Sequence, residues 1–248
     1  MKHAHFVLVV ATALFFASGI SLARAEFYVI SVPAGVGTPI TSAPYTISSP
    51  GFYYFRKDLT SSGTGITVNT DNVTIDLMGF SLTGSGTGYF MGIDITGGRN
   101  NVEIRNGTVR NFSGHGINDI NAGLRQRIIN MRVQDNGAYG IHISGNSHLV
   151  QNCNVSGNGG TGINLIGKSN VIGNVCIDNG GSGISHTGGS GLLKDNLVAD
   201  NDGYGFNVSY LGTSYTYVFD GNSVSANGLG SINGIPPGAA WGVNGGIP

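Results

Sequence analysis

The sequence predicts an all-β chain wound into a parallel β-helix, a solenoid in which each coil stacks on the one before it. Three observations predict this fold: a short repeat, alternating apolar residues inside it, and asparagine and glycine recurring at its turns. The repeat is too short for a strand followed by a crossover helix, which needs about 30 residues. Three short strands with three turns fill it, and each coil then rises by about 4.8 Å.

The repeated phrase is a glycine (alanine once), one variable residue, and then Gly-Ile or Gly-Phe. Its second glycines are Gly116, Gly140, Gly162, Gly183 and Gly205, at intervals of 24, 22, 21 and 22 residues. Such regular spacing indicates one structural unit stacked along a single axis. The apolar residue after each phrase should point inward. We therefore expect a buried spine made of Ile93, Ile117, Ile141, Ile163, Ile184 and Phe206.

Asparagines recur in two places of the repeat. In one, an apolar or β-branched residue precedes a turn asparagine by three places, as in Val133 before Asn136 and Thr108 before Asn111. The other column lies one strand upstream and consists of Asn106, Asn130, Asn152, Asn174, Asn196 and Asn222. A stacked, inward asparagine can donate to one neighbouring coil and accept from the other. Asparagine and glycine also tolerate left-handed corners, so we interpret the 43 glycines as corners.

The amino terminus reads as a secretory signal peptide over residues 1–25. A basic start precedes the apolar run Phe6 to Ile20, and Ala23-Arg24-Ala25 forms a small-x-small cleavage pattern before Glu26. A membrane anchor is the alternative, but about 15 apolar residues fall short of the ~20 needed to span. We expect a secreted or periplasmic protein with no membrane span after cleavage.

The rest of the chain reads as a single domain. Residues 26–50 should form a lead-in that caps the first coil, and residues 51–227 the solenoid. Residues 228–248 lose the repeat and are rich in glycine and proline, so we expect a cap, with Trp241 packed over the end, or a loose tail.

The composition argues against nucleic acid as a partner. Only 10% of residues are charged, against about 25% in ordinary domains, and the net charge is -1. No dense cluster of cations is available to neutralise phosphates. The one modest basic group either faces an acidic polysaccharide or is a solvated surface, and consists of Arg105, Arg110, Arg125, Arg127 and Arg132.

The phrases Asn-x-Val-x-x-Asn and Gly-x-Gly-Ile resemble the repeat of right-handed parallel β-helix proteins, the pectate-lyase-like superfamily. The resemblance covers roughly Ile40 to Asn227. It includes PYTISSPGFYYFRKDL from Pro44 and NVTIDLMGFSLTGSG from Asn72, which look like the opening coils of secreted bacterial members. It implies a right-handed solenoid of about eight coils. It is specific for fold alone, since this architecture carries lyases, hydrolases, epimerases and adhesins.

Functional side chains should lie on an outward column, because inward side chains are locked in the core. The position after each Gly-Ile gives the column Asp94, Asn118, His142, Asn164, Ser185 and Asn207. Asp119 and His186 lie one residue further on and join this column if their strands carry a bulge. The corner just before gives a second column, His115, Tyr139, Thr161, Ser182 and Tyr204.

We expect this face to contact polysaccharide, without an assigned reaction. His115, Tyr139 and Tyr204 would offer aromatic platforms to a sugar chain. Arg105 or Arg132 would pair with a uronate carboxylate.

Two alternatives stay open for the function. One is a lyase or epimerase acting on a uronate polymer, with His142 as base and Asp94 and Asp119 holding Ca2+. The sequence lacks the aspartate cluster of the pectate lyases, the Asp-Pro-His motif of the alginate epimerases and the aspartate pair of the polygalacturonases. The other alternative is a non-catalytic scaffold or adhesin.

The two cysteines, Cys153 and Cys176, fall in adjacent coils. Alignment by the turn asparagines puts Cys176 opposite Val155, which would separate the cysteine α-carbons by about 8 Å, beyond easy bridging. A disulfide, permitted in an exported protein, and two buried small hydrophobes are the two interpretations.

Overall fold

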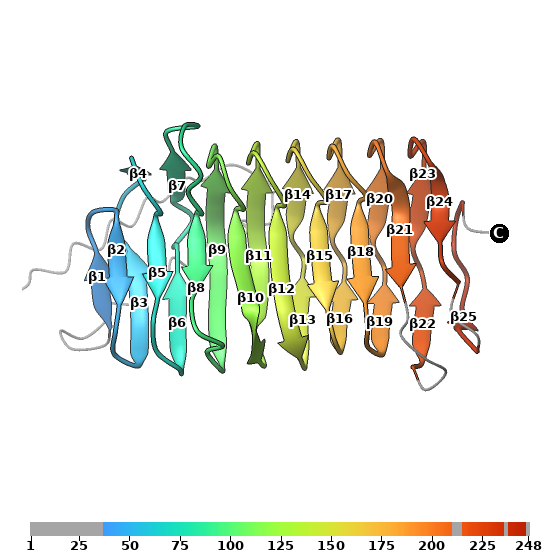
Figure 1. The fold of residues 1–248 in the computed structure, drawn as a ribbon, viewed down its shortest axis with the longest axis horizontal. Helices are drawn as coiled ribbons and strands as arrows, with labels where there is room; N and C mark the ends of the chain where they lie inside the picture. Colours follow the sequence, from blue (N-terminus) through green and yellow to red (C-terminus); the bar gives the residue numbers. More distant parts are fainter. Residues whose placement is uncertain (1–36, 210–214, 236–237, 247–248) are drawn as a thin grey trace, which may run out of the picture. The chain divides into compact units, whose positions relative to one another are not determined.

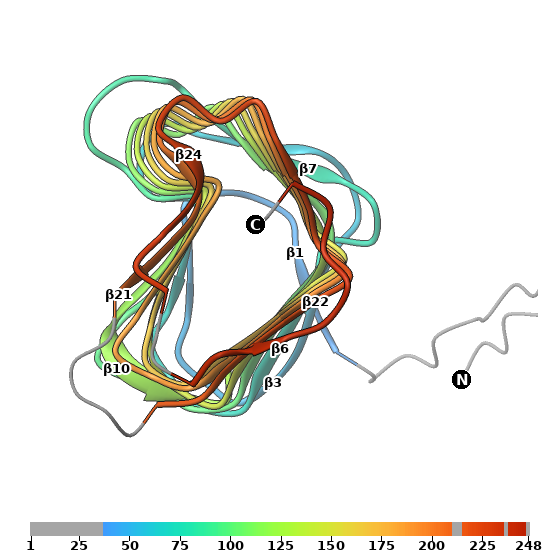
Figure 2. The same cartoon turned by 90° about the vertical axis from the view of Figure 1, so that its right-hand side faces the viewer.

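The computed structural model describes residues 37–209, 215–235 and 238–246, and every regular element in these ranges is a β-strand. Each strand pairs in parallel with the equivalent strand of the next coil. Figure 1 shows the strands side by side in chain order, and Figure 2 looks along the stack of coils. The predicted parallel β-helix is therefore confirmed. The predicted signal peptide lies outside the described residues, and no helix in the described part of the chain could cross a membrane.

One wall of the solenoid, face 1, is a nine-stranded parallel sheet. Its strands are β2 (Tyr45–Ile47), β5 (Ile66–Val68), β8 (Ile93–Ile95), β10 (Ile117–Leu124), β12 (Ile141–Asn146), β15 (Ile163–Ile166), β18 (Ile184–Thr187), β21 (Tyr204–Ser209) and β24 (Gly230–Asn233). The pairing register stacks the six predicted spine residues from Ile93 to Phe206, and each is fully buried. The predicted apolar spine is confirmed.

The other two walls belong to one 16-stranded sheet. Face 2 comprises β1 (Thr38–Ile40), β3 (Gly51–Phe55), β6 (Val73–Asp76), the first half of β9 (Val102–Arg110) and of β11 (Arg127–Gln134), β13 (His148–Gln151), β16 (Ser169–Ile172), β19 (Gly191–Lys194), β22 (Tyr217–Asp220) and β25 (Ala240–Trp241). Face 3 comprises β4 (Leu59–Ser61), β7 (Ser81–Gly84), the second halves of β9 and β11, β14 (Asn154–Ser156), β17 (Val175–Ile177), β20 (Leu197–Ala199) and β23 (Ser223–Ser225). β9 and β11 turn from face 2 to face 3 at Asn106 and Asn130, which take left-handed φ values of 58° and 55°.

A buried asparagine ladder fixes the corner between face 3 and face 1. The side-chain amide of Asn136 donates to Oδ1 of Asn158 (2.9 Å), and that of Asn158 donates to Asn179 (3.0 Å). The ladder continues to Asn227. In the coil before Asn136, Phe112 occupies the ladder position, one residue after the expected Asn111. Asn111 instead adopts a left-handed corner, with φ 57°.

The expected upstream asparagine column is two columns. Asn106, Asn130 and Asn152 are left-handed corners, whereas Asn174, Asn196 and Asn222 lie one place further on and form a second buried ladder. The coil is one residue shorter here than the coil before it. Gly173, with φ 67°, therefore takes the corner place that Asn152 holds one coil earlier.

The phrase glycines are needed for close packing, which corrects their interpretation as corners. Gly140 is not left-handed, but a Cβ built on it would overlap Cγ1 of Val155 and lie 2.9 Å from Nδ2 of Asn158. The glycine phrase of one coil therefore packs against the valine and ladder asparagine of the next.

The solenoid extends past both boundaries expected from the sequence. β1 and β2 already pair with the strands of the next coil, so regular structure within the described residues begins at Thr38. At the other end β24 and β25 add a further coil, and Trp241 stacks on Phe219 with ring centroids 4.7 Å apart.

Candidate functional site

The outward column of face 1 forms as the sequence predicts. Asn118 pairs with Asp94 on one side and with His142 on the other. The Asn118 amide donates to Oδ1 of Asp94 at 2.8 Å. Because successive coils superpose, residues about 24 positions apart become direct neighbours here.

Next to this column, four rings form an aromatic cluster: Tyr89, His115, Tyr139 and His142. The rings of His115 and Tyr139 stack at 5.0 Å with an interplanar angle of 17°. His142 packs edge-on against both, at 5.1 Å from His115 and 5.0 Å from Tyr139. The structure thus brings together three of the predicted site residues in two adjacent coils.

Both imidazoles of the cluster are held in their uncharged form at neutral pH. Burial, and then the neighbouring His115, lowers the pKa of His142 to about 4. Burial also lowers the pKa of His115, although the carboxylate of Asp94 opposes this. Nδ1 of His115 accepts the Tyr139 backbone N–H at 3.0 Å, so its proton resides on Nε2, which lies 3.5 Å from the Tyr89 hydroxyl.

Two buried polar atoms of this site have no hydrogen-bond partner in the described structure: Nδ1 of His142 and Oδ1 of Asn118. They belong to residues paired across neighbouring coils. A buried polar atom without a partner is costly and rare, so both mark a place where a ligand or a small side-chain movement would satisfy them.

Tyr89 is the member of the cluster that sequence reasoning missed. It lies in the connection between β7 and β8, which stands out from the stacked corners in Figure 2. Its side chain is 65% exposed, and Phe90 beside it is 37% exposed. The signal was available as a long interval, since Ile66 and Ile93 are 27 residues apart where later coils take about 22.

Asp119 does not belong to this site, which corrects the prediction. It pairs with Ile143 in the inward column and is fully buried, and its Oδ2 accepts a 2.6 Å hydrogen bond from Gln126. The bulge in β10 falls between Asp119 and Gly123, too late to turn the carboxyl outward. Burial raises the pKa of Asp119. His186 is likewise buried in the core.

The prediction that Asp94 and Asp119 hold Ca2+ together is therefore wrong, because the two carboxyl groups point to opposite sides of the sheet. Within the described ranges, no group of three or more His, Cys, Asp or Glu side chains is arranged to hold a metal ion.

The predicted arginines lie on other walls. On face 2, Arg105 forms ion pairs of 2.8 Å with both Asp76 and Glu103. On face 3, Arg132 donates to Oγ1 of Thr108 at 2.9 Å. Neither can pair with a carboxylate bound at the aromatic cluster. Tyr204 shares the corner column of Tyr139 but lies three coils away, about 14 Å along the axis.

Cys153 and Cys176 are unbonded and buried. The predicted alignment of Cys176 with Val155 is confirmed. Burial raises the pKa of Cys153 to about 12 and also raises that of Cys176. The structure therefore matches the interpretation of two small core residues.

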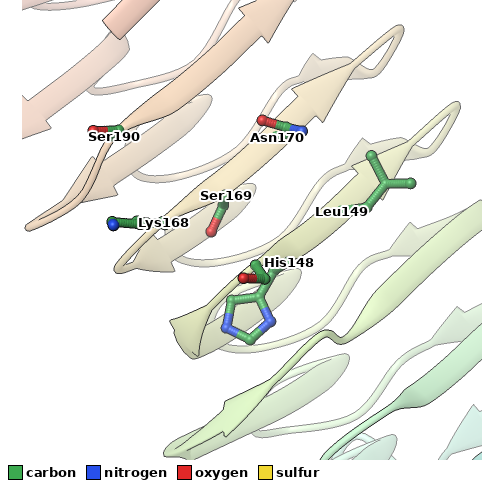
Figure 3. Close-up of a pocket in the computed structure, with 7 residues that line it drawn as sticks. His148, Leu149, Lys168, Ser169, Asn170 and Ser190 are labelled. Atoms are coloured by element: carbon green, nitrogen blue, oxygen red, sulfur yellow. The ribbon is translucent and has the colours of Figure 1, made fainter. Parts of the chain in front are cut away.

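A surface hollow of about 330 Å³ lies at the opposite edge of face 1, where the chain turns to face 2. Figure 3 shows its lining, including Lys168, Ser190 and Asn170. None of the predicted site residues lines it.

Comparisons with known proteins agree with this architecture. Residues 120–236 match the family model described as right handed beta helix region. The match covers 117 of the 248 residues, and the fold of the chain is a right-handed parallel β-helix. Curated protein sequences give no significant match.

Solved structures share the fold at low sequence identity. The periplasmic alginate epimerase AlgG superposes with a TM-score of 0.59 at 14% identity, over 79% of this chain and 50% of that one. The mannuronan C-5 epimerase AlgE4 A-module of Azotobacter vinelandii gives 0.55 at 14% identity, over 84% of both chains. Tailspike protein 2 of bacteriophage CBA120 gives 0.50 at 16%, over 85% and 38%. The β-helix thus spans about half the length of AlgG.

Proposed function

We propose that the protein binds a polysaccharide over face 1, centred on the aromatic cluster. The observation that carries this proposal is the ring of Tyr139, which stacks on the imidazole of His115 and lies beside His142, with the exposed ring of Tyr89 edge-on to His115. His115 itself is buried, so it backs the platform and does not offer its own face to a sugar. Aromatic faces carry negative charge density, and the C–H groups of a sugar ring pack on them favourably. The fold supplies a rigid backing, since every ring but Tyr89 sits at or beside a paired strand.

The comparisons support a polysaccharide as the ligand class. The names of the two epimerases refer to alginate and mannuronan, so this fold serves proteins that act on polysaccharides. Action outside the cytoplasm fits the leader-like residues 1–25.

The geometry favours binding over the lyase or epimerase alternative. His142 and Asp94 are separated by Asn118, and Asp119 is buried on the other side of the sheet. A pKa of about 4 also makes His142 a weak base at neutral pH. We therefore assign no reaction to this face.

Affinity electrophoresis in gels containing a panel of neutral and uronate polymers tests this function. Tyr89→Ala and Tyr139→Ala should weaken binding about fivefold or more, because each removes a stacking surface worth about 1 kcal/mol. Tyr54→Ala is the matched control, since Tyr54 stacks on Phe52 on face 2, away from the cluster. No retardation by any polymer, or equal losses in all three variants, would favour the scaffold alternative.

A further inference from the structure

The surface around the aromatic cluster carries almost no charge. It is made of the outward column of face 1, the corner column before it and the outward column two residues after it. In the described coils from Asp94 to Ser209, these three columns contain Asp94, Thr96, His115, Asn118, Ile120, Tyr139, His142, Ser144, Thr161, Asn164, Ile166, Ser182, Ser185, Thr187, Tyr204, Asn207 and Ser209. No lysine or arginine occurs among them, and Asp94 is the single acidic residue.

The corner that leads into these columns adds negative charge. Four exposed aspartates lie there: Asp135, Asp178, Asp200 and Asp202. Three of them, Asp135, Asp178 and Asp200, hold the left-handed position just before the ladder asparagine, with φ values of 54° to 55°. Their carboxylates therefore follow from the requirements of the corner, and they leave this edge acidic.

One cation lies at this corner, since Arg110 at the end of β9 lines a hollow together with Asp135. The other cations near face 1 lie elsewhere on the solenoid. Arg105 and Arg127 pair with Glu103 on face 2, and Arg132 lies on face 3. Arg99, Arg125 and Lys168 lie past the far edge of face 1, four to seven residues beyond the Asp94 column in their coils. At physiological salt, exposed charges separated by more than about 8 Å are largely screened.

We propose that the glycan bound at the aromatic cluster is uncharged rather than a polyuronate. This inference rests on the proposed function and names the class of its ligand. A neutral sugar can donate a hydroxyl hydrogen to the half-buried Asp94 carboxylate, which already accepts from the buried Asn118 amide. A uronate would bring its carboxylate against Asp94 with no cation to pair with it, since the imidazoles of His115 and His142 are uncharged.

The test compares two ligands that differ only in charge: a mannuronan oligosaccharide, and the same oligosaccharide after its carboxyl groups have been reduced to primary alcohols. Calorimetric titration of the full chain should show tighter binding of the reduced, neutral form. Each unfavourable carboxylate near Asp94 should weaken binding about two- to fivefold. The ratio should shrink as salt is added, because the discrimination is electrostatic.

Variants separate the possible outcomes. Asp94→Asn keeps an oxygen acceptor for Asn118 and should reduce the preference for the neutral ligand by about two- to fivefold. Asp195→Asn makes the same charge change at an exposed left-handed corner between faces 2 and 3, and should leave the preference unchanged. Equal or tighter binding of mannuronan, especially if Lys168→Gln weakens it, would overturn the inference while keeping polysaccharide binding. Binding of neither ligand, with no retardation in the polymer panel, would overturn both.

Discussion

At the scale of single residues, the core contains titratable groups that the proposed site does not use. His148 is 2% exposed and its Nδ1 accepts the backbone N–H of Gln126 at 3.2 Å. His186 is fully buried, with its Nδ1 3.1 Å from the Tyr217 hydroxyl. In both rings Nε2 has no partner among the described residues. Burial lowers the pKa of each to about 4.

These histidines should make the fold sensitive to acid. Their folded pKa lies below the unfolded value of 6.5, so the unfolded chain binds more protons between pH 6.5 and pH 4. Stability is therefore full above pH 6.5 and is lost as the pH falls, by about 3 kcal/mol for each histidine. Urea unfolding measured across this range checks the slope.

His186→Leu isolates one of these contributions, because Leu165 and Val208 flank His186 in the same inward column. Between neutral pH and pH 4, the free energy of unfolding of the variant should fall by about 3 kcal/mol less than that of the parent. The variant is compared with the parent because Asp119, whose pKa burial raises, favours the folded state as the pH falls and so opposes the histidines. An unchanged pH dependence would contradict the role assigned to His186.

At the scale of elements, contacts between neighbouring coils explain why the same residue pattern recurs along the chain. The glycine phrase, the valine and the ladder asparagine meet in space, although Val155 and Asn158 lie 15 and 18 residues after Gly140 in the chain. The three positions are therefore constrained together, which is why they recur together along the chain.

Gly140→Ala should lower the free energy of unfolding by about 1–3 kcal/mol, because its Cβ would overlap Val155 and the backbone carbonyl of Gly162. Gly63→Ala is the matched control: a Cβ there would lie 3.5 Å from Pro44, an ordinary contact, and Gly63 is not left-handed. Urea midpoints of the two variants measure the difference. A Gly140→Ala midpoint equal to that of the control would contradict the packing account.

The element scale also shows where sequence reasoning succeeded and failed. The Gly-x-Gly-Ile phrase correctly predicted that Asp94, Asn118 and His142 stack in one column, because each directly follows a spine isoleucine. It failed for Asp119, because β10 has an insertion whose place relative to the carboxyl is visible only in the pairing. It also failed for Asn111 and Asn174, where neighbouring coils of unequal length shift the turn by one residue.

At the scale of the whole solenoid, each coil contacts only its neighbours, so stability is local along the axis. Trp241→Ala, which removes the stack on Phe219, should speed amide exchange in β25 and β22 and leave β9 and β11 unchanged. Trp241→Phe keeps a ring in this place and should exchange like the parent. Faster exchange in β9 and β11 with Trp241→Ala would show that the coils unfold as one unit.

The sequence alone determined the solenoid, the inward spine and the columns, because a repeat with a fixed period leaves one way to stack its apolar residues. Only the tertiary structure decided which wall each column occupies. Arg105 and Arg132 are separated from His142 by corners, and corner positions depend on backbone conformation rather than on spacing. Tyr89 joined the cluster for the same reason, since the path of an inserted loop is set by the coil it packs against.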